Sequence, residues 1–422
     1  MNNNYMVVVD PYSSGALYAD VLREHDIHPI AVLSSKVPPE VYSKSFNPDD
    51  FDIVFIYDSH SEDELICSLK KFDPVAVITG CESGVKVAEL IAPKIIPERS
   101  NPPELAIARW HKGEMYKAVK KENLTTMRQI CSNSISEIKK WISLENLEGE
   151  DLIIKPPASA STDSVTLVKN GENWEKVFND LINVDNRLGI KNSNLMVQEF
   201  LKGQEYAVDV ISYEGRHSIC SICLYNKIEI NGIIGIYESL QWLSSDFDDF
   251  EVVTEYSFDV LNALGVVYGV SHIEVMMTIN GPRLIEIGAR PHGGGHPKYC
   301  KKAVGDNQLD RMVKSYIKGE LVDKKYALKS QMKVVFFICE KKCYVSGLNK
   351  LNDIKKLDSF FEMCINIKEG DMIAATSDLF SSLSLGFVVL LHSDLEVINK
   401  DCIAVRAIEK NIYISKSFNR SV

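Results

Sequence analysis

The chain lacks the features that would direct it to a membrane or to nucleic acid. None of its apolar stretches reaches the ~18 residues that a bilayer-spanning helix requires, and its first residues contain no basic region followed by an apolar run. We therefore expect no signal peptide, no membrane partner and a cytoplasmic location. The formal net charge is −11. Because no basic patch or arm offsets this charge, we expect no nucleic-acid partner either.

Several local patterns are also missing. There is no internal repeat and no low-complexity segment. The ten cysteines are scattered, as is typical of reduced thiols. The closest pair, Cys220 and Cys223, lies in an alternating strand pattern that turns the two side chains to opposite faces, so we expect both to be structural. The absence of a Gly-x-Ser-x-Gly segment excludes an esterase with a serine elbow.

The length and the local patterns predict more than one domain. The chain has 422 residues, of which 45% are hydrophobic and 25% charged, as in a globular protein of two or three domains. In the first hundred residues short apolar strands alternate with helices, which predicts a parallel sheet covered on both faces. Pro102 and Pro103 indicate a boundary, because successive prolines interrupt regular structure. Beyond about Gln331 the pattern is β-rich and contains no polar cluster that suggests a site.

Two loops in the N-terminal region have the position of ligand-binding loops. Asp10–Gly15 and Gly80–Gly84 each follow a predicted strand and open a predicted helix. Ligands of parallel sheets bind at the carboxyl ends of the strands, and the amides at a helix start suit an anionic group. The alternative is that both loops are ordinary helix caps.

The most informative segment runs from Arg283 to His296, where an apolar strand leads into a glycine-rich turn. Glu286 and Arg290 lie four residues apart at the end of this strand, and Glu274 lies on the strand before it. Mg²⁺ is usually held by one or two carboxylates and the phosphates that it bridges, and a guanidinium offers a planar fork of donors to phosphate. The pattern predicts a site for magnesium and a polyphosphate. The alternative is that Glu286 and Arg290 form a surface ion pair.

Other polar positions extend this prediction. Lys155 ends an apolar strand, where its burial is costly unless the ammonium meets an anion; the alternative is a lysine on an edge strand. The small-residue loop 158–165 could place backbone amides over phosphates, although it contains no glycine and a solvated turn is the alternative. The strand ending in Glu199–Leu201 offers an apolar peptide edge for an adenine, and Glu205 could accept a ribose hydroxyl.

Three histidines lie near these carboxylates in the sequence. His272 precedes Glu274 on the same strand face and either orients it or is a satisfied core histidine. His292 and His296 flank three glycines and could suggest zinc, but no third ligand is visible nearby. They could instead line the pocket and contact a substrate carboxylate.

An ordered set of residues resembles the ATP-grasp superfamily over roughly residues 112–305. The set comprises Lys112, Lys155 with its small loop, Gln198–Leu201, Glu205, Glu274, Glu286 and Arg290. The N-terminal loops resemble the preceding domain of carboxylate–amine ligases, and within that group the chain most resembles the L-amino acid ligases. The resemblance implies an α/β protein with an ATP-grasp fold, α+β in its nucleotide-binding part. The expected parts are a parallel-sheet domain over 1–110, an ATP-grasp core over 111–325 with a mobile lid at about 120–200, and a β-rich subdomain over 326–422.

The resemblance also implies roles for individual residues. ATP would be bound by Lys112, Lys155, Ser159, Ser161, Thr162, Glu199, Phe200, Leu201 and Glu205. Glu274 and Glu286 would bind one or two Mg²⁺ ions, or Mn²⁺ in their place. Arg290 and Lys155 would be catalytic, and Arg290 would hold the transferred phosphoryl group and the charge of the tetrahedral intermediate. We expect the substrate contacts to come from Glu82, Ser83, Arg290, His292 and Gly294.

Two positions depart from the family pattern. The family often has asparagine two residues after the second metal-binding glutamate, where this chain has Gly288. Metal coordination would then rest on the two carboxylates or on water. The lid loop usually carries glycines where this chain has Ser161 and Ser164. Neither departure removes a charged group.

The implied activity is an ATP-dependent ligation of two amino acids. The enzyme would activate one carboxylate as an acyl phosphate and join it to the amino group of the second, giving a dipeptide, ADP and phosphate. One alternative is an ATP-grasp ligase with another acceptor, and another is an ATP-binding regulatory protein without turnover. Arg290 favours turnover, because nucleotide binding alone would not need it. The sequence leaves the two amino acids open, and the resemblance allows a homodimer.

Overall fold

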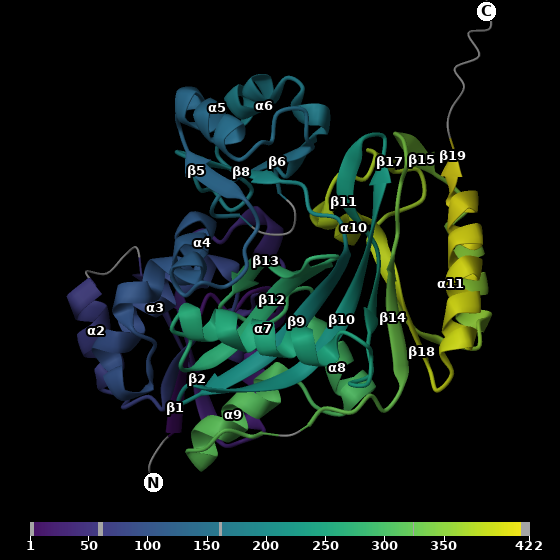
Figure 1. The fold of residues 1–422 in the computed structure, drawn as a ribbon. Helices are drawn as coiled ribbons and strands as arrows, with labels where there is room; N and C mark the ends of the chain where they lie inside the picture. The colour runs from purple at the N-terminus through teal and green to yellow at the C-terminus, as the bar shows by residue number, and fades with distance from the viewer. Residues whose placement is uncertain (1–3, 58–61, 160–162, 324, 415–422) are drawn as a thin grey trace, which may run out of the picture.

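The N-terminal part forms a parallel sheet, as predicted. The computed structural model describes residues 4–57, 62–159, 163–323 and 325–414 (Figure 1). The first four strands pair in the order β3-β2-β1-β4, and all three pairings are parallel. Helices α2 and α3 pack on one face, and α1 and the later helix α9 pack on the other. The bounds are β1 Asn4–Val9, α1 Tyr18–Arg23, β2 Ile27–Leu33, β3 Ile53–Ile56, α2 Glu62–Lys70, β4 Ala76–Thr79 and α3 Val85–Ile95.

The next segment forms a separate small body, the lid, at the top of Figure 1. Its four strands form an antiparallel sheet in the order β5-β8-β6-β7, and its helices α5 and α6 share a hydrophobic cluster of their own with that sheet. The bounds are β5 Gln129–Ser132, α5 Ile135–Leu144, β6 Leu152–Lys155, β7 Thr166–Val168, α6 Trp174–Leu181 and β8 Leu195–Glu199. A body with its own core can move as a unit.

An eight-stranded antiparallel sheet forms the centre of the molecule. Its order is β13-β12-β9-β10-β11-β14-β18-β16, so three strands of the C-terminal region, β14, β18 and β16, extend the central sheet. A three-stranded sheet, β17-β15-β19, lies beside it. The strands are β9 Gln204–Tyr213, β10 Arg216–Ile230, β11 Ile233–Trp242, β12 Gly269–Thr278, β13 Gly281–Gly288, β14 Gln331–Phe336, β15 Cys343–Val345, β16 Phe360–Ile365, β17 Met372–Ile373, β18 Gly386–His392 and β19 Tyr413–Ile414. The helices are α4 Lys112–Lys121, α7 Phe250–Ala263, α8 His296–Val304, α9 Gln308–Lys318, α10 Leu379–Leu385 and α11 Leu395–Glu409.

Two helices, separated by a break, follow the proline pair at residues 102 and 103. A 3-10 helix covers Pro103–Arg109, and α4 starts only at Lys112. The break allows His111 to cap α4, because its Nδ1 accepts the Glu114 N–H at 3.3 Å. A new helix start at this point brings Lys112 towards the centre of the molecule.

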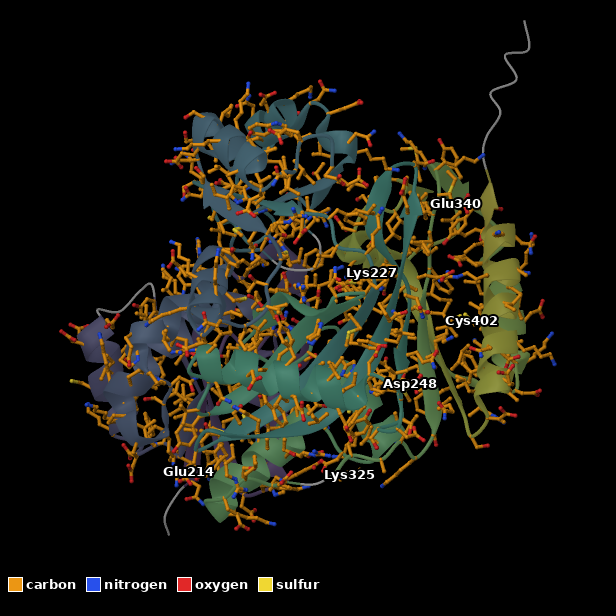
Figure 2. All side chains as sticks on the ribbon, in the orientation of Figure 1. Glu214, Lys227, Asp248, Lys325, Glu340 and Cys402 are labelled. Carbon is orange, nitrogen blue, oxygen red and sulfur yellow. The ribbon has the colours of Figure 1, made fainter. Side chains whose placement is uncertain are left out.

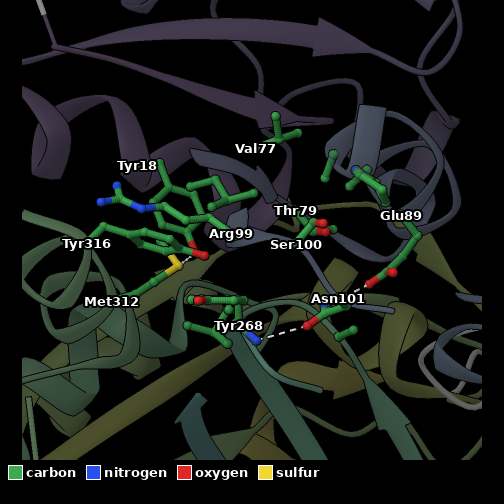
Figure 3. A pocket seen from close by; sticks show the side chains of 17 residues that line it. Tyr18, Val77, Thr79, Glu89, Arg99, Ser100, Asn101, Tyr268, Met312 and Tyr316 are labelled. Atoms are coloured by element: carbon green, nitrogen blue, oxygen red, sulfur yellow. Dashed lines mark hydrogen bonds between the residues drawn. The ribbon is translucent and has the colours of Figure 1, made fainter. Parts of the chain in front are cut away.

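The N-terminal sheet is packed tightly against the central body (Figure 3). The buried guanidinium of Arg109 pairs with Glu89 and donates to the Leu264 carbonyl at 2.9 Å. Asn101 Oδ1 accepts the N–H groups of residues 267 and 268 at 2.8 and 2.9 Å. The cavity left between the two parts holds only about 40 Å³, far below the size of a ligand pocket. This contact therefore positions the N-terminal loops firmly.

All ten cysteines are free thiols. Cys220 and Cys223 are buried in different hydrophobic clusters, and a register shift of β10 lies at Cys220. Across the described ranges, no helix combines the length and the apolar character needed to cross a bilayer.

Candidate active site

A cavity of about 980 Å³ is lined by the N-terminal loops, several strands of the central sheet and α10. Both loops singled out in the sequence reach it, through Ser13 and Ser14 in the first and Glu82 in the second. They follow β1 and β4, where the strand order reverses, which is the usual ligand position in such sheets. The loops touch each other: a Cβ atom at Gly15 would lie 2.4 Å from the Gly80 oxygen. Only glycine fits at this approach.

The prediction that Ser83 contacts the substrate does not fit this geometry. Its hydroxyl donates to Oδ2 of the buried Asp10 at 2.6 Å, and Ser34 donates to the same carboxylate. Ser83 is also absent from the described cavity wall. The residue therefore holds the loop in place, in line with the alternative that this loop is a cap.

The two carboxylates predicted to bind metal are direct cross-strand partners. Glu274 on β12 pairs with Glu286 on β13, and a β-bulge follows immediately, as is common beside active sites. Like charges in this position repel each other. Lys112 Nζ offsets the charge on one side, 3.1 Å from Glu286, and His272 Nε2 lies 3.5 Å from Glu274 on the other. Two hard oxygen donors that face each other fit Mg²⁺.

A half-buried lysine that we did not predict belongs to the same cluster. Lys227, on β10 and labelled in Figure 2, donates to Glu205 at 2.6 Å and lies 4.0 Å from Glu274. Burial and the neighbouring Glu274 carboxylate raise the pKa of Glu205 to about 7, against the opposing effect of Lys227. Burial alone would raise the pKa of Glu274, but Lys227 and His272 outweigh it and lower that pKa. Glu205 thus lies close to the acidic pair formed by Glu274 and Glu286. Its contact with a ribose remains a prediction.

Lys155 and Lys112 reach the cluster from the lid and from α4. Lys112 Nζ donates to the carbonyl of Ser159 at 2.6 Å, so it ties the start of the lid loop to the acidic pair. Burial lowers the pKa of Lys155 to about 8, and Glu286 opposes that shift. Three carboxylates and three lysines nearly balance each other in charge. The phosphates of ATP add further negative charge, which requires the counter-charge of a divalent cation.

The lowered pKa of Lys155 predicts a pH dependence of nucleotide binding. Phosphates bind the charged ammonium, which is present below pH 8 and is lost as the pH rises through that value. We expect the affinity for a non-hydrolysable ATP analogue to be constant below pH 8 and to fall by up to about tenfold per pH unit above it. Titration calorimetry on both sides of pH 8 measures this. Lys155→Arg, which stays charged, should abolish the fall, and an unchanged slope in this variant would assign the titration to another group.

The end of β13 places Arg290 over the cavity. Its Nε donates to Glu82 Oε2 at 2.9 Å, and its Nη1 donates to the Pro291 carbonyl at 3.0 Å. Gly288 makes this arrangement possible: a Cβ there would lie 2.8 Å from Arg290 Nε and 3.0 Å from the Glu82 carboxylate. The glycine at position 288, where the family often has asparagine, therefore makes room for the Arg290 guanidinium. Arg290 and Glu286 are not the isolated surface ion pair that the sequence left open.

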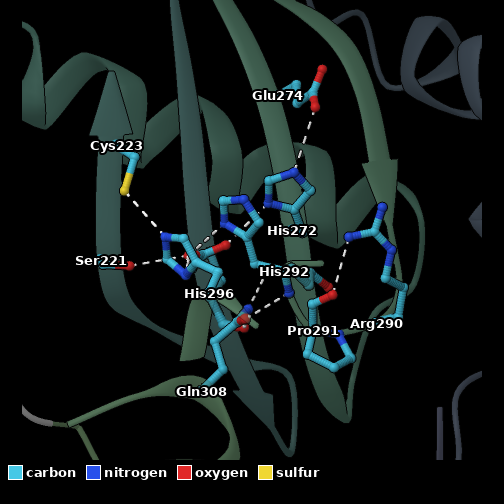
Figure 4. A network of polar contacts seen from close by, with 12 residues as sticks. Ser221, Cys223, His272, Glu274, Arg290, Pro291, His292, His296 and Gln308 are labelled. Carbon is cyan, nitrogen blue, oxygen red and sulfur yellow. Dashed lines mark hydrogen bonds and ion pairs between the residues drawn. The ribbon is translucent and has the colours of Figure 1, made fainter. Parts of the chain in front are cut away.

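Three histidines gather around one aspartate at the floor of the cavity (Figure 4). Asp209 Oδ1 lies 3.1 Å from His272 Nδ1, and its Oδ2 lies 3.1 Å from His292 Nδ1 and 3.4 Å from His296 Nδ1. Burial would raise the pKa of Asp209, but the imidazoles lower it well below its usual range. Burial and the neighbouring His272 lower the pKa of His292 to about 4. His292 is therefore a neutral member of a fully hydrogen-bonded network.

Asp209 is the third group that a zinc site with His292 and His296 would have needed, and the three donor atoms lie within 4.8 Å of one another. The ring geometry argues against a metal. The two imidazoles stack with centroids 3.7 Å apart and planes 10° apart. A ring nitrogen binds through a lone pair in the ring plane, and one ion cannot lie in two parallel planes. We interpret the group as a hydrogen-bond network that supports Glu274 through His272.

The N-terminal loop holds the glycine-rich turn from the other side. Ser13 Oγ accepts the N–H of Gly294 at 3.0 Å, and Ser14 Oγ accepts that of Gly295 at 3.0 Å. His292 and Gly294 both line the cavity, as predicted substrate contacts should. Their contact with a substrate remains a prediction.

The lid loop is described only in part. Ser159 is buried beside Lys112, whereas Ser161 and Thr162 lie outside the described residues. Ser164 has φ +59°, a left-handed conformation that glycine adopts without cost. The family glycine at this position thus corresponds to a real backbone requirement, which serine meets at a cost of about 1–2 kcal/mol.

The predicted adenine edge is partly engaged within the lid. The Glu199 N–H donates to the Arg128 carbonyl and the Phe200 N–H to the Asp151 carbonyl, both at 3.0 Å. The Glu199 carboxylate pairs with the Arg128 guanidinium at 2.6 Å. Among the described contacts, none engages the N–H of Leu201. A main-chain contact with adenine at this edge remains a prediction.

One ion pair ties the lid to the C-terminal part of the chain. Arg187 Nη2 lies 2.7 Å from the carboxylate of Asp378, which caps α10. The backbone N–H of Arg187 donates to the carboxylate of Asp163 in the lid loop at 2.8 Å. The guanidinium also lies 5.6 Å from the centre of the Phe380 ring. These contacts hold the lid against α10 and thus over one side of the cavity.

Removal of this tie should let water into the site. We expect Arg187→Ala to increase the phosphate released per molecule of ligated product by about twofold to fivefold, the range of a partly exposed ion pair. Parallel assays of phosphate and product measure this ratio. Lys176→Ala, which removes an exposed pair on α6, is the control. An unchanged ratio in Arg187→Ala would show that the lid closes without this tie.

Three site residues escaped the sequence analysis: Asp209, Tyr225 and Lys227. The hydroxyl oxygen of Tyr225 lies 2.9 Å from His292 Nε2. A weak signal existed for the other two, because Asp209 and Lys227 interrupt strand patterns that are otherwise largely apolar. A buried charge in a strand requires a partner, but the sequence does not identify that partner.

Comparison with known proteins agrees with this geometry. The family model described as ATP-grasp domain matches residues 148–297. Dapdiamide A synthase from Enterobacter agglomerans is 24% identical over 98% of this chain and 97% of its own length. The crystal structure of an L-amino acid ligase from Bacillus licheniformis superposes with a TM-score of 0.74 at 13% identity, covering 98% of this chain and 99% of that one. The biotin carboxylase domain of 2-oxoglutarate carboxylase from Hydrogenobacter thermophilus, crystallised with MgADP and bicarbonate, gives a TM-score of 0.63 at 10% identity, with coverage of 97% and 90%.

These likenesses confirm the predicted ATP-grasp fold, and they support the predicted class, an ATP-grasp carboxylate–amine ligase that forms C–N bonds with ATP. Within this class it is similar to dapdiamide A synthase and to an L-amino acid ligase along nearly its whole length.

Proposed function

We propose that the protein joins two amino acids into a dipeptide through an acyl phosphate. The observation that carries the proposal is the position of Arg290, which faces the same cavity as the Glu274–Glu286 pair. This cavity has about 980 Å³, near the upper end of the roughly 300–1,000 Å³ that small-molecule sites occupy. The space suits two amino acids beside the end of a nucleotide.

In the first step the carboxylate of one amino acid attacks the γ-phosphorus of ATP, and the bond to ADP breaks. Lys155 and Lys112 would bind the phosphates, and Glu274 and Glu286 would hold Mg²⁺, which supplies counter-charge to the phosphates when bound. The enzyme contributes mainly alignment and charge neutralisation. The lid excludes water, which would hydrolyse the acyl phosphate.

In the second step the neutral amino group of the other amino acid attacks the acyl carbon. The carbonyl oxygen gains charge, the C–O bond to phosphate then breaks, and the departing phosphate takes up the proton that the nitrogen loses. The Arg290 guanidinium lines the cavity and can stabilise that charge. Its partner Glu82 is the carboxylate in the same wall that can bind a substrate ammonium.

The test is an incubation with ATP, Mg²⁺ and pools of the twenty L-amino acids, read by phosphate release and product mass. We expect a product whose mass equals two amino acids minus water, formed far more slowly by Lys155→Ala and Arg290→Ala. Phosphate release with a product of another mass would assign a different acceptor. ATP binding without turnover in every pool would overturn the proposal in favour of a regulatory protein.

A further inference from the structure

The cavity has a second, apolar side that the charged residues do not use. We define the apolar wall as six of the lining side chains that carry no polar atom. They are Leu240, Val334, Phe336, Leu379, Leu383 and Phe387. Five of them follow residue 331, in the region where the sequence showed no site.

The register of the central sheet assembles this wall. Leu240 on β11 pairs with Val334 on β14, and Phe336 pairs with Phe387 on β18, so each pair points to one face. Leu379 and Leu383 are four residues apart and therefore lie on the same side of α10, which lines the cavity there. Two strand pairs and one helix thus form a continuous apolar surface.

The charged groups that the proposed reaction uses lie elsewhere in the sheet, while Ser381 and Ser384 of α10 line the cavity beside the apolar wall. Glu274 and Glu286 belong to β12 and β13, at one end of the strand order, whereas β14 and β18 are near the other end. Beside α10, the charges of Arg187 and Asp378 are paired with each other. The described part of the wall therefore offers a substrate only hydrophobic contact.

We propose that the apolar wall binds the side chain of one of the two joined amino acids, and that this side chain is large and aliphatic or aromatic. The inference rests on the proposed dipeptide ligation and specifies its substrate class. Wall and reacting groups line one continuous cavity, so a substrate held at Arg290 can extend its side chain to the wall. Burial of apolar surface favours such a substrate over glycine or a charged amino acid.

The test compares kcat/KM for amino acids that differ in side chain, with the sequence of each dipeptide product read by tandem mass spectrometry. We expect leucine, methionine or phenylalanine to exceed glycine, aspartate and lysine at one position by at least about tenfold, because one methylene group in an apolar pocket is worth about 10- to 200-fold. Equal rates for apolar and charged side chains at both positions would overturn the inference.

Variants of the wall add a second measurement. Leu383→Trp should fill the pocket and lower the ratio of kcat/KM for phenylalanine to that for alanine by about tenfold or more. Leu383→Ala should enlarge the pocket, so this variant should accept larger substrate side chains than the wild type does. Phe387→Ala enlarges the same pocket by a substitution on β18. This variant keeps the test valid if a substitution at Leu383 disturbs the short helix α10. Leu144→Ala, at a leucine that is 71% exposed on α5, is the matched control.

The two proposals fail in different ways. Dipeptides formed with the same preference in the wild type and in all wall variants would overturn the apolar wall as a binding site and leave the ligation intact. A failure to form any dipeptide, with ATP cleaved for another acceptor, would overturn the ligation and this inference together.

Discussion

Arg290→Ala is expected to lower kcat by about 100- to 1,000-fold, the loss found when one donor of an oxyanion site is removed. The guanidinium is buried in the cavity wall, and Glu82 and the neighbouring carboxylates hold its pKa above its usual range, so it is always charged. Charge that develops on the substrate in a site shielded from water would lose its compensating cation. Steady-state kinetics of phosphate release and product formation measure the effect.

The same strand offers a matched control. Arg283 lies near the start of β13, whereas Arg290 follows the end of that strand, and the described contacts of the Arg283 guanidinium are with the carbonyls of Asn280 and Pro282. Arg283→Ala should therefore keep kcat near the wild-type value. Arg290→Lys should retain part of the activity, since it keeps the charge and loses the fork of donors. Full activity in Arg290→Ala would remove this residue from the mechanism.

Gly288→Asn, which restores the residue common in the family, is expected to impair the enzyme. The new Cβ would lie 2.8 Å from Arg290 Nε and 3.0 Å from Glu82 Oε2, so the guanidinium must move. A displacement of about 1 Å of a positioning group can cost about 100-fold in rate, and we expect a loss of that order in kcat. Kinetic assays with a thermal melt of each variant separate this effect from unfolding.

A second glycine of the site serves as the control for this substitution. Gly293 lies in the glycine-rich turn, and a Cβ there would meet only Ser13 Oγ at 3.8 Å, an ordinary contact. Gly293→Ala should be nearly neutral. Activity of Gly288→Asn equal to or above the wild type would show that the site accommodates asparagine. The explanation that Gly288 leaves room for the Arg290 guanidinium would then be wrong.

Much of the site could be predicted because its residues end strands or stand in apolar runs. Lys155, Glu274, Glu286 and Arg290 carry charges where a strand pattern predicts burial, and a buried charge must have a partner. The order of these motifs along the chain also supported the ATP-grasp resemblance. Local periodicity likewise predicted the N-terminal parallel sheet, because strands that alternate with helices have few other arrangements.

The sequence by itself thus determined the class of fold, the charged groups and the nucleotide chemistry, all of which depend on residue type and local spacing. Only the tertiary structure decided which distant residues meet. It placed Asp209 among three histidines, Lys227 against Glu205, and the strands beyond residue 331 as an apolar wall of the cavity. Strand register sets these contacts across long sequence separations, and a shift of one residue reverses every side chain. No local pattern in the sequence carries that information.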